Sequence, residues 1–448
     1  MQSVLLILMI VSVFTGIALG IPVMFVLLGV PIIAGLAGTA IGVFDPTLFA
    51  AIPTRIFGIM DNQVLYAVPL FILMGKLLEH SGLAERALLS VTRAFDHSAR
   101  SIAFSVIGIS VVIACTSGIV GATITMLGAI VLPAMRSLEL RERFSAGLIV
   151  ASGSLGQIIP PSIVLILLSD QISSAHVATQ LGKGNFSPDP VSVGHLFAGA
   201  LLPGLCLAAA YVIYAGFTLN EKQLPAVNSP DPDEENDLDL VGLLTIFSLL
   251  LVPVSILLGL VTVNEASAAG VLIIGTITIW WGRRENMGAA LSEAVELTGV
   301  IFGIILAASV FSLILRGFEG DALVESLFQQ LPHGGYWALL CVMAIVFLLG
   351  FLIEFVEITY VVVPITAPIL FALDIDPIWF AVLMAVNLQI SFLTPPMGIS
   401  LFYYKSVSSI ETVELYRSVI PYVCIQLILI MLLFVFPPLA TWLPSVLI

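Results

Sequence analysis

The stretch ASGSLGQIIPPSI, Ala151 to Ile163, decides how this sequence folds. It places Gln157 and the pair Pro160-Pro161 inside an apolar segment that is long enough to span a bilayer. A proline lacks a backbone N–H, and an unpaired backbone group costs several kcal/mol in hydrocarbon. We therefore expect the helix to break where protein or a water-filled cavity surrounds it, so that the freed groups can bind ions or substrates. A simple kink in an ordinary membrane helix is the alternative.

The same pattern, a polar residue followed by a Pro-Pro pair in an apolar segment, recurs in NLQISFLTPPMGIS, Asn387 to Ser400. Here Gln389 and Thr394 precede the pair Pro395-Pro396. One Pro-Pro pair could be a kink, but two in matching contexts favour a transporter with two broken membrane helices.

The composition places the chain in a membrane. Of its 448 residues, 59% are hydrophobic and only 10% are charged, and the mean hydropathy is +1.15. Continuous apolar blocks predict an all-α polytopic protein and argue against a β-barrel, which shows short alternating segments. The net charge of −14 includes an acidic run at Asp231 to Asp239, and no basic cluster typical of nucleic-acid binding occurs.

Other motifs are scarce. The four cysteines lie in apolar segments without C-x-x-C spacing and the histidines form no cluster, so we expect no transition-metal site. The N-terminal run MQSVLLILMIVSVF reads as the first membrane helix and not as a signal peptide. The polar segment from Lys76 to Arg100, with Arg86 and Arg93 at helical spacing, predicts a solvated surface helix.

Residues 101–136 form an apolar block that is too long for one membrane helix, which needs about 20 residues. Its centre holds Thr116, Ser117 and Gly118, a small polar tip suited to a re-entrant helical hairpin. Basic residues flank both ends, including Arg93 before and Arg141 after, so the positive-inside rule places both ends in the cytoplasm.

Residues 337–371 form a second apolar block with a polar centre, made of Glu354, Glu357 and Thr359. Its flanks, from His333 to Asp374 and Asp376, carry no Lys or Arg, which fits a hairpin that enters from outside.

The order of hairpin and broken helix is the same in both halves. Gly118 and Pro160 are 42 residues apart, and Glu354 and Pro395 are 41 apart. Opposite charge patterns around the two hairpins predict two inverted-topology repeats with a site near the membrane midplane. The predicted division is a first repeat, 1–219, with hairpin 101–136 and broken helix 146–168; an acidic, Pro-rich linker, 220–239; and a second repeat, 240–448, with hairpin 337–371 and broken helix 380–403. Both termini are then expected on the periplasmic side.

Oxygen-bearing side chains and glycines gather at the breaks and hairpin tips, where they could bind Na⁺ and the substrate. For each Ser or Thr, a hydrogen bond back to its own helix is an equally good interpretation. The candidates are Thr116, Ser117, Gly118, Ser152, Gly153, Ser154, Gln157, Pro160, Glu354, Thr359, Gln389, Ser391, Thr394, Pro395 and Gly398.

The two glutamates need a separate explanation, because a carboxylate at the bilayer centre costs about 2.5–3.5 kcal/mol even on the insertion scale. Glu354 and Glu357 could bind a cation, be protonated, or reach water at the tip. No Lys or Arg lies in either broken segment, so half-helix N-termini and bound ions would have to balance an acidic substrate.

At these positions the sequence resembles the large membrane subunit of tripartite ATP-independent periplasmic (TRAP) transporters, within the ion transporter superfamily. The resemblance covers nearly the whole chain. Its most specific motifs are GSLGQIIPPSI at Gly153–Ile163, GFLIE at Gly350–Glu354, PITAPIL at Pro364–Leu370, DIDP at Asp374–Pro377 and LTPPMGISLF at Leu393–Phe402.

The resemblance implies an elevator-type importer of organic acids, driven by a sodium gradient, in a bacterial or archaeal cytoplasmic (inner) membrane. It also implies two partners, a small four-helix membrane subunit and a periplasmic substrate-binding protein. A stand-alone anion/sodium symporter and, less well supported, a channel are the alternatives. An enzyme is not expected, because no paired His, Ser-Lys or Asp-Asp arrangement occurs with catalytic spacing and no P-loop pattern is present.

Overall fold

The computed structural model describes residues 1–447 except 95–98, 118–119, 220–238, 330–333 and 396–397. Within these ranges the chain is helical and contains no strand. Eight helices are long and apolar enough to cross a membrane, and the bent pair Pro46–Met60 and Gln63–His80 would make a ninth. The prediction of an all-α polytopic membrane protein is therefore confirmed.

The helices of the first half run up to the acidic segment and include three short 3₁₀ turns, labelled η. They are α1 (Gln2–Ala18), α2 (Val23–Ala40), η1 (Pro46–Ala51), α3 (Ile52–Met60), η2 (Gln63–Tyr66), α4 (Ala67–His80), α5 (Leu83–Ala94), α6 (Ala99–Ser117), α7 (Val120–Ser137), α8 (Glu142–Ser154), η3 (Leu155–Gln157), α9 (Ile163–Gly182) and α10 (Val193–Thr218).

The helices of the second half include one 3₁₀ turn, η6, and one π-helical turn, η7. They are α11 (Leu240–Leu257), α12 (Val263–Trp281), η6 (Arg284–Asn286), α13 (Met287–Gly317), α14 (Gly320–Gln329), α15 (Gly335–Leu349), α16 (Phe355–Glu357), η7 (Ile358–Val362), α17 (Val363–Ala372), α18 (Pro377–Leu393), α19 (Ile399–Lys405), α20 (Thr412–Val435) and α21 (Pro438–Leu447).

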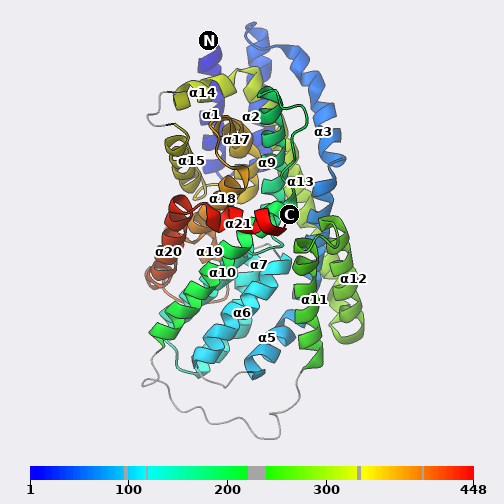
Figure 1. The fold of residues 1–448 in the computed structure, drawn as a ribbon, viewed down its shortest axis with the longest axis vertical. Helices are drawn as coiled ribbons and strands as arrows, with labels where there is room; N and C mark the ends of the chain where they lie inside the picture. The colour runs from blue at the N-terminus through cyan, green and yellow to red at the C-terminus, as the bar shows by residue number, and fades with distance from the viewer. Residues whose placement is uncertain (95–98, 118–119, 220–238, 330–333, 396–397, 448) are drawn as a thin grey trace, which may run out of the picture.

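The helices associate in two groups, each of which takes members from both halves of the chain. In the first, which we call the arm group (α1–α5 and α11–α13), α4 packs on α12 and α13, α2 packs on α13, and α5 packs on α11. In the second, the hairpin group (α6–α10 and α15–α21), α7 packs on α8, α9 on α17, α15 on α18, and α20 on both α8 and α18. Figure 1 shows α3, α11 and α12 along one side of the molecule and α15, α19 and α20 along the other.

The two broken helices lie at the centre of the hairpin group. Every residue of α8 from Phe144 to Ser154 is buried, as is α9 from Ile163 to Asp170. The same holds for α18 from Trp379 to Leu393. By contrast, α1, α11 and α20 expose many large apolar side chains, including Leu8, as expected of helices that face lipid. The first break, and the helix that leads into the second, are therefore surrounded by protein.

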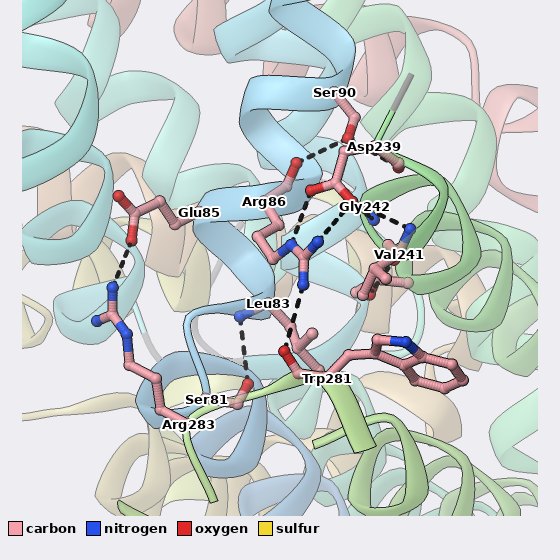
Figure 2. A network of polar contacts seen from close by, with 11 residues as sticks. Ser81, Leu83, Glu85, Arg86, Ser90, Asp239, Val241, Gly242, Trp281 and Arg283 are labelled. Atoms are coloured by element: carbon pink, nitrogen blue, oxygen red, sulfur yellow. Dashed lines mark hydrogen bonds and ion pairs between the residues drawn. The ribbon is translucent and has the colours of Figure 1, made fainter. Parts of the chain in front are cut away.

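A polar network joins α5 to α11 (Figure 2). The Arg86 guanidinium donates from Nε to Asp239 Oδ2 over 2.7 Å and from Nη2 to Asp239 Oδ1 over 2.9 Å. Its Nη1 donates to the Trp281 carbonyl over 3.2 Å. Asp239 also accepts from the amides of Val241 and Gly242 and so caps the N-terminus of α11.

The segment was predicted to form a solvated surface helix. In the structure α5 is partly exposed at Arg86 but buries its other face, which includes Ala87 and Leu88. The apolar residues of α5 recur at helical spacing, so this helix is amphipathic and packs its apolar face against its neighbours.

Contacts also join loop regions of the two halves of the chain. Lys183, just after α9, pairs with Asp374 after the second hairpin, with 2.6 Å between Nζ and Oδ1. Arg143 at the start of α8 donates to the Arg417 carbonyl near the start of α20 over 3.0 Å. The assignment of the two sides to periplasm and cytoplasm, the positions of the termini and the inverted symmetry stay predictions. His333 lies outside the described residues.

Candidate functional site

The first break runs from Leu155 to Ser162. Helix α8 ends at Ser154, a single 3₁₀ turn follows, and α9 begins only at Ile163, after the two prolines that cannot donate to the helix. The Ser162 hydroxyl donates to the Gln157 carbonyl over 2.8 Å and so satisfies one of the freed acceptors. Pro160 is buried within this segment. The sequence analysis predicted this break at the right residues.

The second break runs from Thr394 to Gly398, between α18 and α19. The Thr394 hydroxyl donates back to the Ile390 carbonyl over 2.7 Å, and the Ser391 hydroxyl donates to the Leu388 carbonyl over 2.9 Å. Both side chains thus follow the alternative interpretation of the sequence, in which they bond to their own helix. Pro395 is half-buried in a turn, and Pro396 lies outside the described residues.

Gly398 is required for close backbone approach. A Cβ atom there would lie 2.7 Å from the Phe392 carbonyl oxygen, so any larger residue would force the chain away from the end of α18. The start of α19 is therefore folded tightly against the last turn of α18.

A buried hydrogen bond joins the two broken helices. Gln389 on α18 donates from Nε2 to the Ser154 hydroxyl over 3.2 Å, and Ser154 donates in turn to the Ala151 carbonyl over 2.8 Å. Helix α18 also contacts α8 and the turn η3. Candidate residues that are more than 200 positions apart in the sequence, Ser154 and Gln389, are thus brought together beside the first break.

Several buried oxygens near the breaks and on the second hairpin have no hydrogen-bond partner within the described parts of the chain. They are Ser152 Oγ, Gln157 Oε1, Gln389 Oε1, Thr359 Oγ1 and Glu357 Oε2. Unpartnered buried polar atoms also occur elsewhere, for example on Ser105 and Tyr422. The atoms on Ser152, Gln157 and Gln389 differ because they lie beside the first break, where the prolines leave backbone carbonyls without helical donors. Together these oxygens are a donor set suited to a hard cation such as Na⁺.

The first hairpin, α6 and α7, packs against both broken helices. Gly153 of α8 lies so close to α7 that a Cβ atom would come within 2.6 Å of Ile124 Cγ1. Gly121 lies equally close beneath the ring of Tyr403 on α19. Thr116 and Ser117 end α6, but their side chains and all of Gly118 lie outside what the structure describes.

The second hairpin contacts α18 through its tip. A Cβ atom on Gly350 would lie 2.1 Å from Ser391 Oγ, so only glycine allows this approach. Glu354 is exposed at the tip, whereas Glu357 is only 3% exposed and Thr359 is fully buried. No hydrogen bond joins Glu354 or Thr359 to Ser391 or Thr394 among the described residues. The glutamate that needs an explanation for its burial is therefore Glu357.

The comparisons with known proteins identify the family. The model of the family described as "Tripartite ATP-independent periplasmic transporter, DctM component" matches residues 4–439. The chain belongs to this family.

The relatives of this TRAP transporter permease cover nearly its whole length. It is 26% identical to the C4-dicarboxylate TRAP transporter large permease protein DctM of Pseudomonas aeruginosa, over 92% of this chain and 93% of that one. It is 27% identical to the sialic acid TRAP transporter large permease protein SiaM of Vibrio cholerae, over 96% of both. It is 25% identical to the 2,3-diketo-L-gulonate permease YiaN of Escherichia coli, over 94% and 95%. These are transporter subunits, so the expectation that the chain is not an enzyme is confirmed.

Two solved structures share the fold. The YdaH transporter of Alcanivorax borkumensis aligns with a TM-score of 0.62 at 15% identity, over 88% of this chain and 90% of that one. MtrF of Neisseria gonorrhoeae, one of a class of antimetabolite efflux pumps, aligns with a TM-score of 0.55 at 14% identity, over 86% of this chain and 83% of that one.

Sequence reasoning missed three polar residues of this permease. Ser162 closes the first break, as described above. Asn387 donates to the Met343 carbonyl over 2.7 Å and ties α18 to α15. Asp170 accepts from Tyr360 over 3.0 Å. A polar side chain inside an apolar run was the available signal for all three, because such residues are expensive at membrane depth.

The described residues contain no group of three His, Cys, Asp or Glu that could hold a metal ion. Cys206, Cys341 and Cys424 are free thiols on separate helices.

Proposed function

We propose that this permease imports a small organic acid on an inward sodium gradient, by an elevator movement of the hairpin group against the arm group. It would act with a small four-helix membrane subunit and a periplasmic substrate-binding protein. The relatives are named for C4-dicarboxylates, sialic acid and 2,3-diketo-L-gulonate, all of which carry a carboxylate. This common chemistry supports an organic acid as the substrate.

The observation that supports sodium binding is the set of buried oxygens without a hydrogen-bond partner beside the first break. An unsatisfied buried polar atom costs about 1–3 kcal/mol, and such atoms are few in native proteins. A bound Na⁺ would offset this cost at Ser152, Gln157 and Gln389, and it would also be ligated by the backbone carbonyls that the prolines set free. The ion is cargo that moves with the organic acid and supplies the driving force.

The separation into two helix groups supports the elevator movement. Both breaks and both hairpins belong to the hairpin group, so this group could carry a bound ion and acid as one unit. Its contacts with the arm group run mainly through α6, which touches α4, α5 and α11, and through η7, which touches α13.

Uptake into proteoliposomes tests the function. We expect transport of a labelled organic acid to require an inward sodium gradient, the small subunit and the loaded binding protein. Uptake that persists in potassium or choline would refute sodium coupling. Sodium-driven uptake without a binding protein would identify a stand-alone symporter, and flux that does not saturate would indicate a channel.

A matched pair of serines on α8 tests the ion site. Ser152→Ala removes an unpartnered hydroxyl, whereas Ser145→Ala removes an equally buried one that bonds back to the Arg141 carbonyl. A hydrogen bond or ligand contact to a charge contributes about 1.5–3 kcal/mol. We therefore expect Ser152→Ala to raise the sodium concentration for half-maximal uptake about tenfold or more, with little change for Ser145→Ala. Equal effects of the two substitutions would contradict the assignment.

A further inference from the structure

A cavity of about 300 Å³ lies where the arm group meets the hairpin group, away from the two breaks. Its walls come from α3, η2 and α13 on one side and from α9, η7 and α17 on the other. In Figure 1 these helices occupy the half of the molecule that contains α1 and α14. On α9 the lining begins at Asp170, seven residues beyond Ile163, which corresponds to about 10 Å along the helix axis. The cavity is therefore separate from the candidate ion site.

Arg55 is the unusual residue of this cavity. It is half-buried, and within the described ranges no carboxylate lies at ion-pair distance from it. Its Nη1 makes one long contact, 3.5 Å, to the Ser309 carbonyl. Removing a guanidinium partly from water without pairing it with an anion costs free energy. Its planar N–H donors can bind both oxygens of a carboxylate at once.

The one carboxylate in the cavity wall already has partners. Asp170, which is 8% exposed, accepts from Asn62 Nδ2 over 2.5 Å, from Gln171 Nε2 over 2.8 Å and from the Tyr360 hydroxyl over 3.0 Å. A carboxylate has about four acceptor positions, so Asp170 can take one further donor. Arg316 adds a second positive charge, although it is paired with Asp321 at 3.2 Å.

We propose that this cavity binds a small hydroxylated organic acid, with its carboxylate on Arg55 and a hydroxyl on Asp170. The volume is at the lower end of the range for small-molecule sites, which suits a ligand of a few carbon atoms. The ligand class rests on the proposed function, but the site rests on the cavity and its charges. A lipid phosphate would offer Arg55 the same anionic oxygens, so the experiment must separate the two sources.

Protection from labelling tests the site. In the full chain with its four cysteines changed to Ser, Ser174→Cys puts a thiol on the exposed cavity wall of α9. The protein is placed in phosphatidylcholine nanodiscs without sodium, and its reaction with a membrane-impermeant maleimide is followed against malate concentration. We expect malate to slow labelling saturably and the uncharged polyol erythritol to leave the rate unchanged.

Arg55→Gln should raise the malate concentration for half-protection about tenfold or more, since a charged hydrogen bond contributes about that factor in affinity. Arg55→Lys keeps the charge without the fork and should give an intermediate shift, and Arg284→Gln on η6 is the distant control. An unchanged rate with malate, or the same protection curve for Arg55→Gln as for Arg284→Gln, overturns the site.

Phosphatidylglycerol nanodiscs distinguish the source of the anion. If this lipid alone slows labelling, and Arg55→Gln restores the rate, the occupant is a lipid phosphate and the organic acid is refuted. Because no sodium or uptake is involved, the outcome is independent of the transport test. Protection without any uptake in proteoliposomes would refute the proposed function alone, and uptake without protection would refute this site alone.

Discussion

Breaking the ion pair between Arg86 and Asp239 should destabilise the start of α11 (Figure 2). Two charge-assisted hydrogen bonds of 2.7 and 2.9 Å would contribute about 1.5–3 kcal/mol each if fully buried. The Arg86 side chain is 39% exposed, however, and solvent reduces the gain from such pairs. We therefore expect Arg86→Gln and Asp239→Asn each to weaken the first turn of α11 by about 1–2 kcal/mol.

Asp239→Ala removes the N-cap as well as the ion pair, so it should cost about 1 kcal/mol more than Asp239→Asn. Hydrogen exchange of peptides that contain Val241 and Gly242 measures this locally, and about 1.4 kcal/mol corresponds to tenfold faster exchange. Asp376→Asn is the matched control, because Asp376 caps α18, pairs with no arginine in the described parts of the chain, and can be replaced by an equally good cap, asparagine. Unchanged exchange in both Arg86→Gln and Asp239→Asn would show that the ion pair does not stabilise α11.

The ion pair between Arg86 and Asp239 also predicts that the stability of the start of α11 depends on pH. Burial alone would raise the pKa of Asp239, but the Arg86 guanidinium and the Gly242 and Val241 amides outweigh it and hold the pKa below its ordinary 3.8. A carboxylate with a lowered pKa stabilises the fold above its unfolded pKa and loses that contribution as the pH falls through the folded one. Exchange protection of α11 should thus be constant near neutrality and fall below about pH 4. In Asp239→Asn this step should be absent.

Three further predictions concern the hairpin group. Replacing both Pro160 and Pro161 by Ala favours a continuous helix by about 3 kcal/mol per proline. We expect this variant to fold but to lose both its sodium-dependent thermal shift and its uptake. Normal values of both would show that the prolines only kink the helix. Gly350→Ala puts a methyl group 2.1 Å from Ser391 Oγ, so it should lower the thermal unfolding temperature or uptake, whereas an unaffected protein would mean that the hairpin tip moves freely away from α18. Cysteines at Arg141 and Asp374 should label from opposite sides of the membrane, and labelling from one side would end the inverted-repeat hypothesis.

The positions of the breaks could be predicted from sequence because their cause is local. A proline lacks its donor in any environment, so Pro160 and Pro161 interrupt the helix whatever packs around them. The break after α18 was predicted at Pro395 for the same reason. No neighbouring residue can supply the backbone N–H that a proline lacks, so the position of each break is set by the sequence alone.

The roles of individual hydroxyls could not be predicted, because they depend on rotamers and on distant partners. Ser152 and Ser391 look alike in sequence, yet the first is unpartnered and the second bonds to its own helix. Glu354 and Glu357 are three residues apart, but one is exposed and the other buried. The partners of Asp170 include Asn62 and Tyr360, which are more than 100 positions away in opposite directions along the chain. Only the tertiary fold specifies these contacts.

The unpartnered oxygens at the breaks are not an unavoidable result of placing polar residues at this depth. Ser162 and Asn387 are equally buried, and both donate to a backbone carbonyl over 2.7–2.8 Å. The fold can therefore satisfy a polar side chain within the first break and inside the buried helix α18. Ser152 and Gln157 are left with open acceptors in the same surroundings, at about 1–3 kcal/mol each. These open acceptors beside satisfied neighbours are the reason why we propose that a cation occupies this site during the transport cycle.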